Sequence, residues 1–192
     1  MKAKLIIVIG LVAALVLPAG AVAKPTKSDQ RNAARECKAL RGSTDATREA
    51  FRASFKSMGS CVAQKAKEEA TERRVAKVNA AKECKAEMAD PNFASTHSNK
   101  TFADFYGTND NDKNAFGKCV STKAHEKKAD EDAKDQQAVN GFKNAAKACD
   151  AERDDSNFAS THSNKTFADF YGTNDNDRNA FGKCVSSKAR ES

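Results

Sequence analysis

Apolar residues recur every three or four positions in the long segment between Val62 and Asp90. This segment has neither glycine nor proline and is rich in alanine, lysine and glutamate, which favour helix. Its apolar positions form one narrow stripe: Val75, Val78, Ala81, Cys84 and Met88. Because this period matches an α-helix with one apolar face, the sequence predicts a long helix that buries the stripe.

Two further segments show the helical spacing. They contain Phe116, Cys119, Val120 and Ala124, and then Phe142, Ala145, Ala146 and Cys149. The step from Cys119 to Cys149 is seven residues longer than the step from Cys61 to Cys84. Seven residues are about two helical turns, which favours continuous helix between the cysteines. The pair Asn140-Gly141 is typical of a break, so we expect a kink or interruption there.

The most hydrophobic part of the chain is its start. Lys2 and Lys4 precede an apolar run from Leu5 to Leu17, and Ala21-Val22-Ala23 forms an A-x-A processing site. As a helix the run would span ~20 Å, short of the ~30 Å hydrocarbon core of a bilayer. We predict a secretory signal peptide over residues 1–23, cleaved after Ala23. The mature chain is then expected to be secreted, with no membrane span.

The remaining residues offer little material for a large core. Residues 24–192 contain one leucine, no isoleucine, six valines and eleven phenylalanines. These four residue types together make up a fraction of the mature chain well under the ~20% below which disorder becomes a concern. Alanine supplies much of the other apolar content and buries little area. Something besides apolar burial must stabilise the fold.

Six cysteines are the candidates for this role, and all follow the predicted signal peptide. Zinc ligands usually come in pairs two to four residues apart, and no two cysteines here lie within twenty residues. Disulfides are therefore expected. Cysteines at the two ends of one long helix would lie ~35–45 Å apart, far beyond the ~7 Å that a disulfide allows. The remaining natural pairing is Cys37–Cys61, Cys84–Cys119 and Cys149–Cys184.

The chain contains an internal repeat. Residues 92–121 recur at 157–186 with one difference, Lys113 becoming Arg178. A degenerate first copy runs from Asn32 to Cys61. We divide the mature chain into a basic first unit at 24–67, a second unit with its connecting helix at 68–127 and a third at 128–192. Each unit is predicted to be a helical hairpin closed by one disulfide.

Aromatic residues concentrate at the expected tips of the second and third hairpins. They are Phe93, Phe102, Phe105 and Tyr106, with the copies Phe158, Phe167, Phe170 and Tyr171. In so thin a core, these rings are expected first to seal the hairpin. The alternative is a partly exposed binding surface, since aromatic clusters make good anchors. Gly107 and Gly172, after the tyrosines, suit a turn with positive φ.

The polar residues after each tip resemble a calcium loop. Asp110–Asn114 has the D-x-D-x-N spacing, but Ser121 stands where a bidentate glutamate is needed and the central glycine is missing. Asp175–Asn179 departs from the pattern in the same way. We therefore predict that residues 108–110 cap the following helix, with Asp112 in its first turn. No metal site and no cofactor are predicted.

His97 and His162 lie in identical Ser-Thr-His-Ser-Asn contexts. Paired with Asp104 or Asp169, they could form a Ser-His-Asp arrangement of a hydrolase. The segment offers no evident oxyanion hole or scaffold that would orient a base. We therefore expect solvated loop histidines and no catalytic residue.

Charge is unevenly distributed along the chain, whose formal net charge is +7. Residues 24–85 hold sixteen Lys or Arg against eight Asp or Glu, whereas residues 86–192 hold fifteen against eighteen. A basic first unit could bind an anionic polymer of the cell wall, lipid headgroups or nucleic acid. The alternative is an ordinary solvated helix surface with mixed charges.

The motif Tyr-Gly-Thr-Asn followed by Asn-Ala-Phe-Gly-Lys-Cys-Val-Ser occurs at 106–121 and again at 171–186. It resembles uncharacterised exported proteins of actinobacterial type. The resemblance covers the second and third units, and the first unit departs from it at Phe55–Cys61. It implies a bacterial, Gram-positive host and no particular activity.

Together these patterns predict an all-α fold of tandem disulfide-closed hairpins joined by long connecting helices, either extended or folded back as a bundle. Two near-identical tips on one chain raise avidity for a repetitive target, whereas an active site gains little from tandem copies. We therefore expect a secreted, non-enzymatic interaction or structural module for a cell-envelope polymer or protein. The alternatives are an anionic-polymer binder acting through the first unit and a hydrolase using the histidine loops.

Overall fold

The computed structural model describes residues 23–191, which form nine helices and no strand. The all-α prediction is confirmed. The predicted signal peptide falls on residues 1–22 apart from Ala23, and so lies outside the described residues. Among the helices of this described part, none is both long and apolar enough to cross a membrane.

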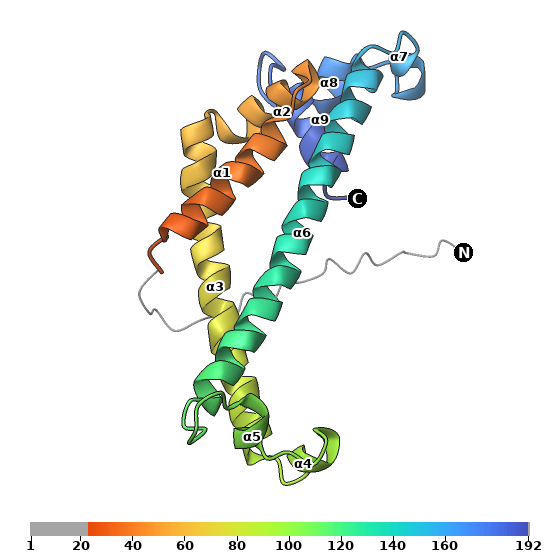
Figure 1. Ribbon diagram of the computed structural model, residues 1–192. Coiled ribbons are helices and arrows are strands. Elements are labelled where there is room, and N and C mark those ends of the chain that lie inside the picture. Colours follow the sequence, from red (N-terminus) through yellow and green to blue (C-terminus); the bar gives the residue numbers. More distant parts are fainter. Residues whose placement is uncertain (1–22, 192) are drawn as a thin grey trace, which may run out of the picture.

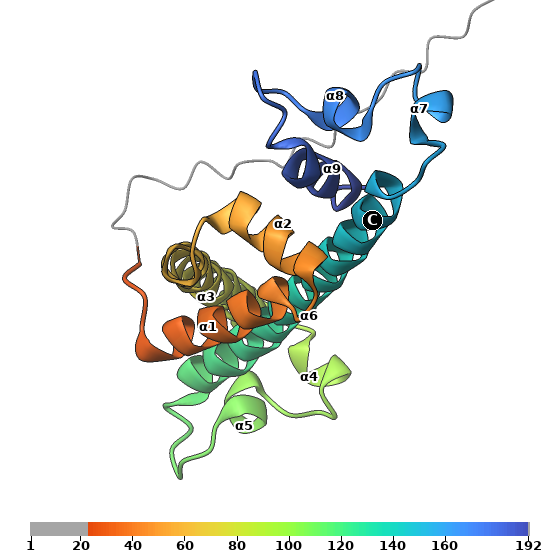
Figure 2. The same cartoon turned by 90° about the horizontal axis from the view of Figure 1, so that it is seen from above.

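Two long helices form the frame, and the short helices lie at its ends. The helices are α1 (Lys27–Arg41), α2 (Asp45–Phe55), α3 (Met58–Ala89), α4 (Phe93–Thr96), α5 (Phe102–Tyr106), α6 (Ala115–Arg153), α7 (Phe158–Thr161), α8 (Phe167–Tyr171) and α9 (Ala180–Lys188). Helix α3 packs along both α1 and α6, and α2 packs against α6 and α9 (Figures 1 and 2). Helices α4 and α5 lie at one end of α6, and α7 and α8 lie at its other end (Figure 1).

All three predicted disulfides are present, each with 6.0 Å between its Cα atoms. They are Cys37–Cys61, Cys84–Cys119 and Cys149–Cys184. They join α1 to α3, α3 to α6, and α6 to α9. Each unit is therefore closed by a covalent link across the stem of its hairpin.

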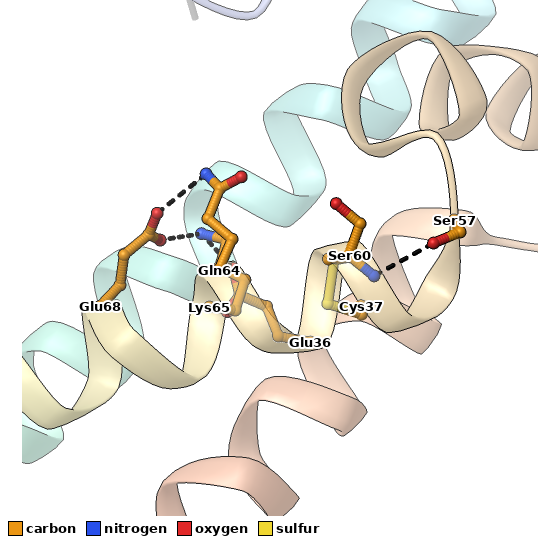
Figure 3. Close-up of a disulfide and its surroundings, with 8 residues drawn as sticks. Glu36, Cys37, Ser57, Ser60, Gln64, Lys65 and Glu68 are labelled. Carbon is orange, nitrogen blue, oxygen red and sulfur yellow. Dashed lines mark hydrogen bonds and ion pairs between the residues drawn. A yellow bond between two sulfur atoms is a disulfide. The ribbon is translucent and has the colours of Figure 1, made fainter. Parts of the chain in front are cut away.

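Polar contacts support the stem that the first disulfide closes (Figure 3). The Ser57 hydroxyl accepts a 3.1 Å hydrogen bond from the Ser60 amide and so caps α3. One turn past the disulfide, the Lys65 ammonium lies 2.7 Å from Glu36 on α1 and 3.0 Å from Glu68. Helices α1 and α3 are thus joined by an ion pair as well as by sulfur.

The core consists of small clusters rather than one large interior. Each of the three clusters contains both cysteines of one disulfide, surrounded mainly by alanine and a few larger residues. Alanine side chains allow close approach of the helix backbones but bury little area each. The disulfides therefore supply stability that the thin core lacks.

The three units are packed together, an arrangement that the sequence analysis left open. Val139, in the middle of α6, belongs to the cluster of the first unit with Leu40 and Phe51. Helix α2 contributes Ala46 and Ala50 to the cluster of the third unit. The first unit therefore folds back onto α6 and α9, and the molecule is a bundle rather than an extended string.

The predicted apolar stripe on α3 is wrong at Val78 and Met88. Val78 is 43% exposed and Met88 is 53% exposed, although Cys84 is buried. The buried face instead runs through Ala76 and Ala80 to Cys84. Alanine suits these positions because α3 packs closely against its neighbouring helices. A stripe of larger residues would increase the distance between α3 and those helices.

The predicted interruption at Asn140-Gly141 is also wrong, because α6 continues from Ala115 to Arg153. Val139, 2% exposed, packs into the first unit, and Phe142 packs against the first and third clusters. This packing on either side of Gly141 offsets the ~1 kcal/mol that a glycine costs in a helix.

Candidate functional site

Each tip is built around one buried phenylalanine. The Phe93 side chain is 4% exposed, and its ring centroid lies 5.5 Å from that of Phe102, 5.8 Å from Phe105 and 6.3 Å from Tyr106. The copy around Phe158 repeats this arrangement, with 5.6, 5.8 and 6.2 Å to Phe167, Phe170 and Tyr171. Edge-to-face and tilted pairs at these distances stabilise one another beyond the area that they bury.

The histidines belong to these clusters and are not simple solvated loop residues. The His97 ring lies flat on Phe93 with centroids 3.8 Å apart, and the edge of Phe105 meets it at 4.7 Å. Its Nδ1 lies 2.9 Å from both the Phe93 carbonyl and the Thr96 hydroxyl. His162 makes the same contacts with Phe158 and Phe170. The expectation of solvated histidines failed because the polar residues around each histidine give no sign that its ring packs on a phenylalanine four positions earlier.

The aromatic residues of each tip differ in exposure. Phe93 and Phe158 are buried, and the half-buried Phe102 and Tyr106 pack against the disulfide cluster of their stem. Phe105 and Phe170 remain 44% and 43% exposed. Each tip therefore has an inner seal and one protruding ring beside a half-buried imidazole.

The tip backbone is held by local hydrogen bonds. Thr101 and Asp104 form a capping box at the start of α5, with bonds of 3.2 and 3.3 Å. The Asp104 carboxylate therefore bonds to Thr101, and the His97 Nδ1 faces Phe93 and Thr96. The two groups that a Ser-His-Asp arrangement would join are engaged separately.

The predicted capping by residues 108–110 is wrong. The N-cap of α6 is Asn114, with no side-chain capping bond, and Asp112 precedes the helix with φ of 50°. Instead, the Thr108 backbone amide donates a 3.1 Å hydrogen bond to the Asn114 side chain. The Asn114 side-chain amide in turn donates a 2.8 Å bond to the Thr108 hydroxyl. These bonds close the loop on itself and bring the chain back to the stem.

Gly107 and Gly172 are required for space and not for a left-handed backbone. Their φ values are −65° and −63°, so the predicted positive φ is wrong. A Cβ at Gly107 would lie 2.0 Å from the Asp112 carboxylate and 2.5 Å from the Ala103 carbonyl. The loop therefore crosses the end of α5 at a distance that no side chain allows.

A half-buried polar network joins each tip to its stem. The Tyr106 hydroxyl donates a 3.0 Å hydrogen bond to Glu87 on α3, and Lys123 on α6 lies 2.8 Å from the same carboxylate. In the third unit, the Tyr171 hydroxyl lies 2.9 Å from the Glu152 carboxylate, and Lys188 lies 2.7 Å from it. Glu87 and Lys123 were missed from the sequence, although Glu152 and Lys188 follow them by the same 65 residues as the cysteines.

This network shifts the ionisation of its members. Burial alone would raise the pKa of Glu87, but the hydrogen bonds from Lys123 and Tyr106 outweigh it and hold this pKa below its usual range. The pKa of Glu152 is lowered in the same way by Lys188 and Tyr171. Burial and the bond to Glu152 together raise the pKa of Tyr171 to about 12.

A second group of titratable residues lies between α1, α3 and α6. In the described part of the chain, Glu36, Glu69 and Asp135 are the one set that brings three possible metal-ligand atoms within 4.8 Å. They border a cavity of about 280 Å³. Lys65 lies 2.7 Å from Glu36, and Lys128 lies 2.9 Å from Glu69. Since two ammonium groups already pair with two of the carboxylates, we interpret the group as a partly buried ion-pair network.

The two tips are equivalent in structure and distant in space. Their helices α4 and α5 correspond to α7 and α8, with the same lengths and the same caps. They lie at opposite ends of α6, whose 39 residues span about 58 Å at ~1.5 Å per residue. Two equivalent tips are thus placed at the two ends of one continuous helix.

No family model, curated protein or solved structure matches this chain.

Proposed function

We propose that the protein is an exported, non-enzymatic interaction protein that uses its two aromatic tips to bind a repetitive partner on or near the cell envelope. The observation that carries this proposal is the presentation of one half-exposed phenylalanine, Phe105 or Phe170, at each end of α6. Two identical contacts on one rigid chain turn the second binding event into an intramolecular one.

Export is supported by two independent features. The N-terminal pattern of Lys2 and Lys4, an apolar run and Ala21-Val22-Ala23 is typical of a cleaved signal peptide. The described cysteines are all paired in disulfides, which persist in oxidising compartments. We propose a mature chain that begins at Lys24 in a Gram-positive host.

The test uses the mature chain and isolated Gram-positive cell walls in a sedimentation binding assay. Phe105→Ser and Phe170→Ser each remove one protruding ring, and circular dichroism checks that each variant folds. Because avidity adds about 10²–10⁴ to affinity, each single variant should lose at least tenfold, and the double variant should lose binding. Val78→Ser, which changes an exposed apolar residue away from the tips, should bind like the parent chain. Equal binding by the double variant and the parent would refute the proposal.

The anionic-polymer alternative predicts different results. Binding through the basic first unit should fall steeply as salt rises, whereas contact through aromatic rings should change little. Deletion of the first unit is not a clean test, because α1 and α2 pack against α6. Charge reversal at the exposed Arg31, Arg41 and Arg48 leaves the packing intact. These variants should bind normally if the tips are the binding surfaces.

A further inference from the structure

The repeated sequence block occurs in two different surroundings. Phe181, in α9, is 4% exposed, whereas its counterpart Phe116, at the start of α6, is 38% exposed. A Cβ placed on Gly182 would lie 2.7 Å from the Ala53 Cβ, whereas one placed on Gly117 would meet nothing within 4 Å. One copy of this helix face is thus covered and the other is open.

The cover in the third unit is α2. Its Ala46 and Ala50 belong to one buried cluster with Phe181 and Val185, and its Ala53 faces Gly182. The three alanines follow the spacing i, i+4, i+7, which places them on one face of a helix. This face of the block is therefore shaped to receive a helix with a stripe of small residues, and Gly182 permits its close approach.

The corresponding open face in the second unit forms a groove of about 750 Å³. Its apolar floor consists of Ala81, Phe116, Val120 and Ala124, beside Gly117. We call these five residues the open face. They match Ala146, Phe181, Val185, Ala189 and Gly182 of the third unit. The first unit supplies one α2, which is already packed on the third unit, so no helix of the described chain remains to cover this second copy.

The edges of the open face differ in charge from those of the covered one. In the third unit, the Arg153 guanidinium lies 4.5 Å from the centre of the Phe181 ring and 2.8 Å from Glu49 of α2. Met88 stands in place of Arg153 in the second unit, and Lys85 stands in place of Asp150. Lys77 lines the groove, and it and Lys85 have no acidic partner among the described residues.

This charge pattern selects the occupant. An isologous dimer through two open faces would bring the lysines of both copies together, which is unfavourable. A helix with carboxylates along its flanks would pair with Lys77 and Lys85, while small residues in its stripe would contact Phe116 and Val120. We propose that the open face binds a helix of another protein that has small residues at i, i+4 and i+7 and acidic flanks. This proposal is independent of the function of the tips.

The test uses a stapled, fluorescent helical peptide with the sequence of residues 43–57, in which Ser54 and Lys56 are replaced by glutamate, so that together with Glu49 they make both flanks of the alanine stripe acidic. Fluorescence anisotropy measures its binding to the mature chain. Gly117→Leu fills the space that the docked helix needs, and it should weaken binding at least tenfold without disturbing the fold. Gly59→Leu is the matched control, since Gly59 also lies in the first turn of a helix with nothing within 4 Å of its Cβ position. This control should bind like the parent.

Several outcomes would overturn the proposal. One is no binding of the peptide below millimolar concentration. Another is equal binding by the parent chain and Gly117→Leu. A third is a concentration-dependent dimer in analytical ultracentrifugation that Gly117→Leu abolishes, because the open face would then be occupied by a second copy.

A version of the peptide with lysine in place of glutamate at both positions should bind at least tenfold more weakly if the acidic flanks are recognised.

Discussion

The hydroxyl of Tyr106 donates a 3.0 Å hydrogen bond to the carboxylate of Glu87 across 19 residues of sequence. Glu87 lies on α3, and Lys123 on α6 reaches the same carboxylate at 2.8 Å. One acidic side chain therefore joins the tip to both helices of its stem. The same relationship between Tyr171 and Glu152 at the other end of α6 shows that the tips are held in a defined orientation.

Removal of this hydrogen bond should loosen a tip without unfolding the protein. Tyr106→Phe keeps the ring in the aromatic cluster but leaves Glu87 with Lys123 alone. Since a hydrogen bond to a charged group contributes about 1.5–3 kcal/mol, the amides of α5 should exchange at least tenfold faster. Hydrogen exchange measured by mass spectrometry checks this, with the untouched α8 as internal control. Unchanged exchange in α5 would mean that the bond is absent in solution.

The tips should also loosen in acid. The pKa values of Glu87 and Glu152 are lower in the folded chain than in the unfolded chain. Their contribution to stability is therefore present above the ordinary glutamate pKa of about 4.3 and is lost as pH falls through the lower folded values. The chain contains two tyrosines and no tryptophan, so tyrosine fluorescence reports on the tips alone. A transition below about pH 4 is expected, and Glu87→Gln with Glu152→Gln should abolish it.

Alkaline titration tests the same network from the tyrosine side. The pKa of Tyr171 is raised to about 12 and that of Tyr106 is raised as well. Stability from these groups is present below the ordinary tyrosine pKa of about 10 and is lost as pH rises through the folded values. Absorbance at the tyrosinate band should therefore rise well above pH 10 in the folded chain. Titration near 10, as in a chain unfolded by urea, would contradict the network.

The disulfide pairing followed from the sequence for a physical reason. Helix is a local property, and the composition from Val62 to Asp90 determines it without knowledge of the fold. Once that segment is helical, the rise per residue excludes a link between Cys61 and Cys84. The identical spacing of the cysteines in the last two units then leaves little choice.

The features that failed depend on contacts that arise when the chain folds back on itself. The buried face of α3 is chosen by close approach to α1 and α6, so Ala80 is buried and Val78 is exposed. Helix α6 passes through Gly141 because Phe142 packs on two units at once. The need for glycine at 107 arises from Asp112, which a loop returns to within 2.0 Å of the missing Cβ. These contacts form only when helices or a returning loop pack together, so local patterns could not reveal them.

Loss of a disulfide should affect the second unit more than the third. The loops closed by Cys84–Cys119 and Cys149–Cys184 both span 35 residues, so each link contributes about 4 kcal/mol in the chain-entropy model. Both units keep the packing of their own helices when the link is removed, but the third unit is additionally packed against α2. Serine at both cysteines of the second unit should lower exchange protection in α5. The matching change in the third unit should lower protection less in α8, the counterpart of α5.

A matched pair of glycine substitutions tests whether α2 covers α9 in solution. Gly117→Ala should stabilise the protein by about 0.5–1 kcal/mol, because glycine is unfavourable in a helix and the new methyl group meets nothing within 4 Å. Gly182→Ala occupies the same position in an identical sequence, but its Cβ would lie 2.7 Å from that of Ala53. Crowding of this kind costs about 1–3 kcal/mol and exceeds the helical gain, so this variant should be destabilised. Urea denaturation followed by circular dichroism measures both. If the two variants were equally stabilised, α2 would not lie against α9, and the covered face could no longer serve as a guide to what binds the open one.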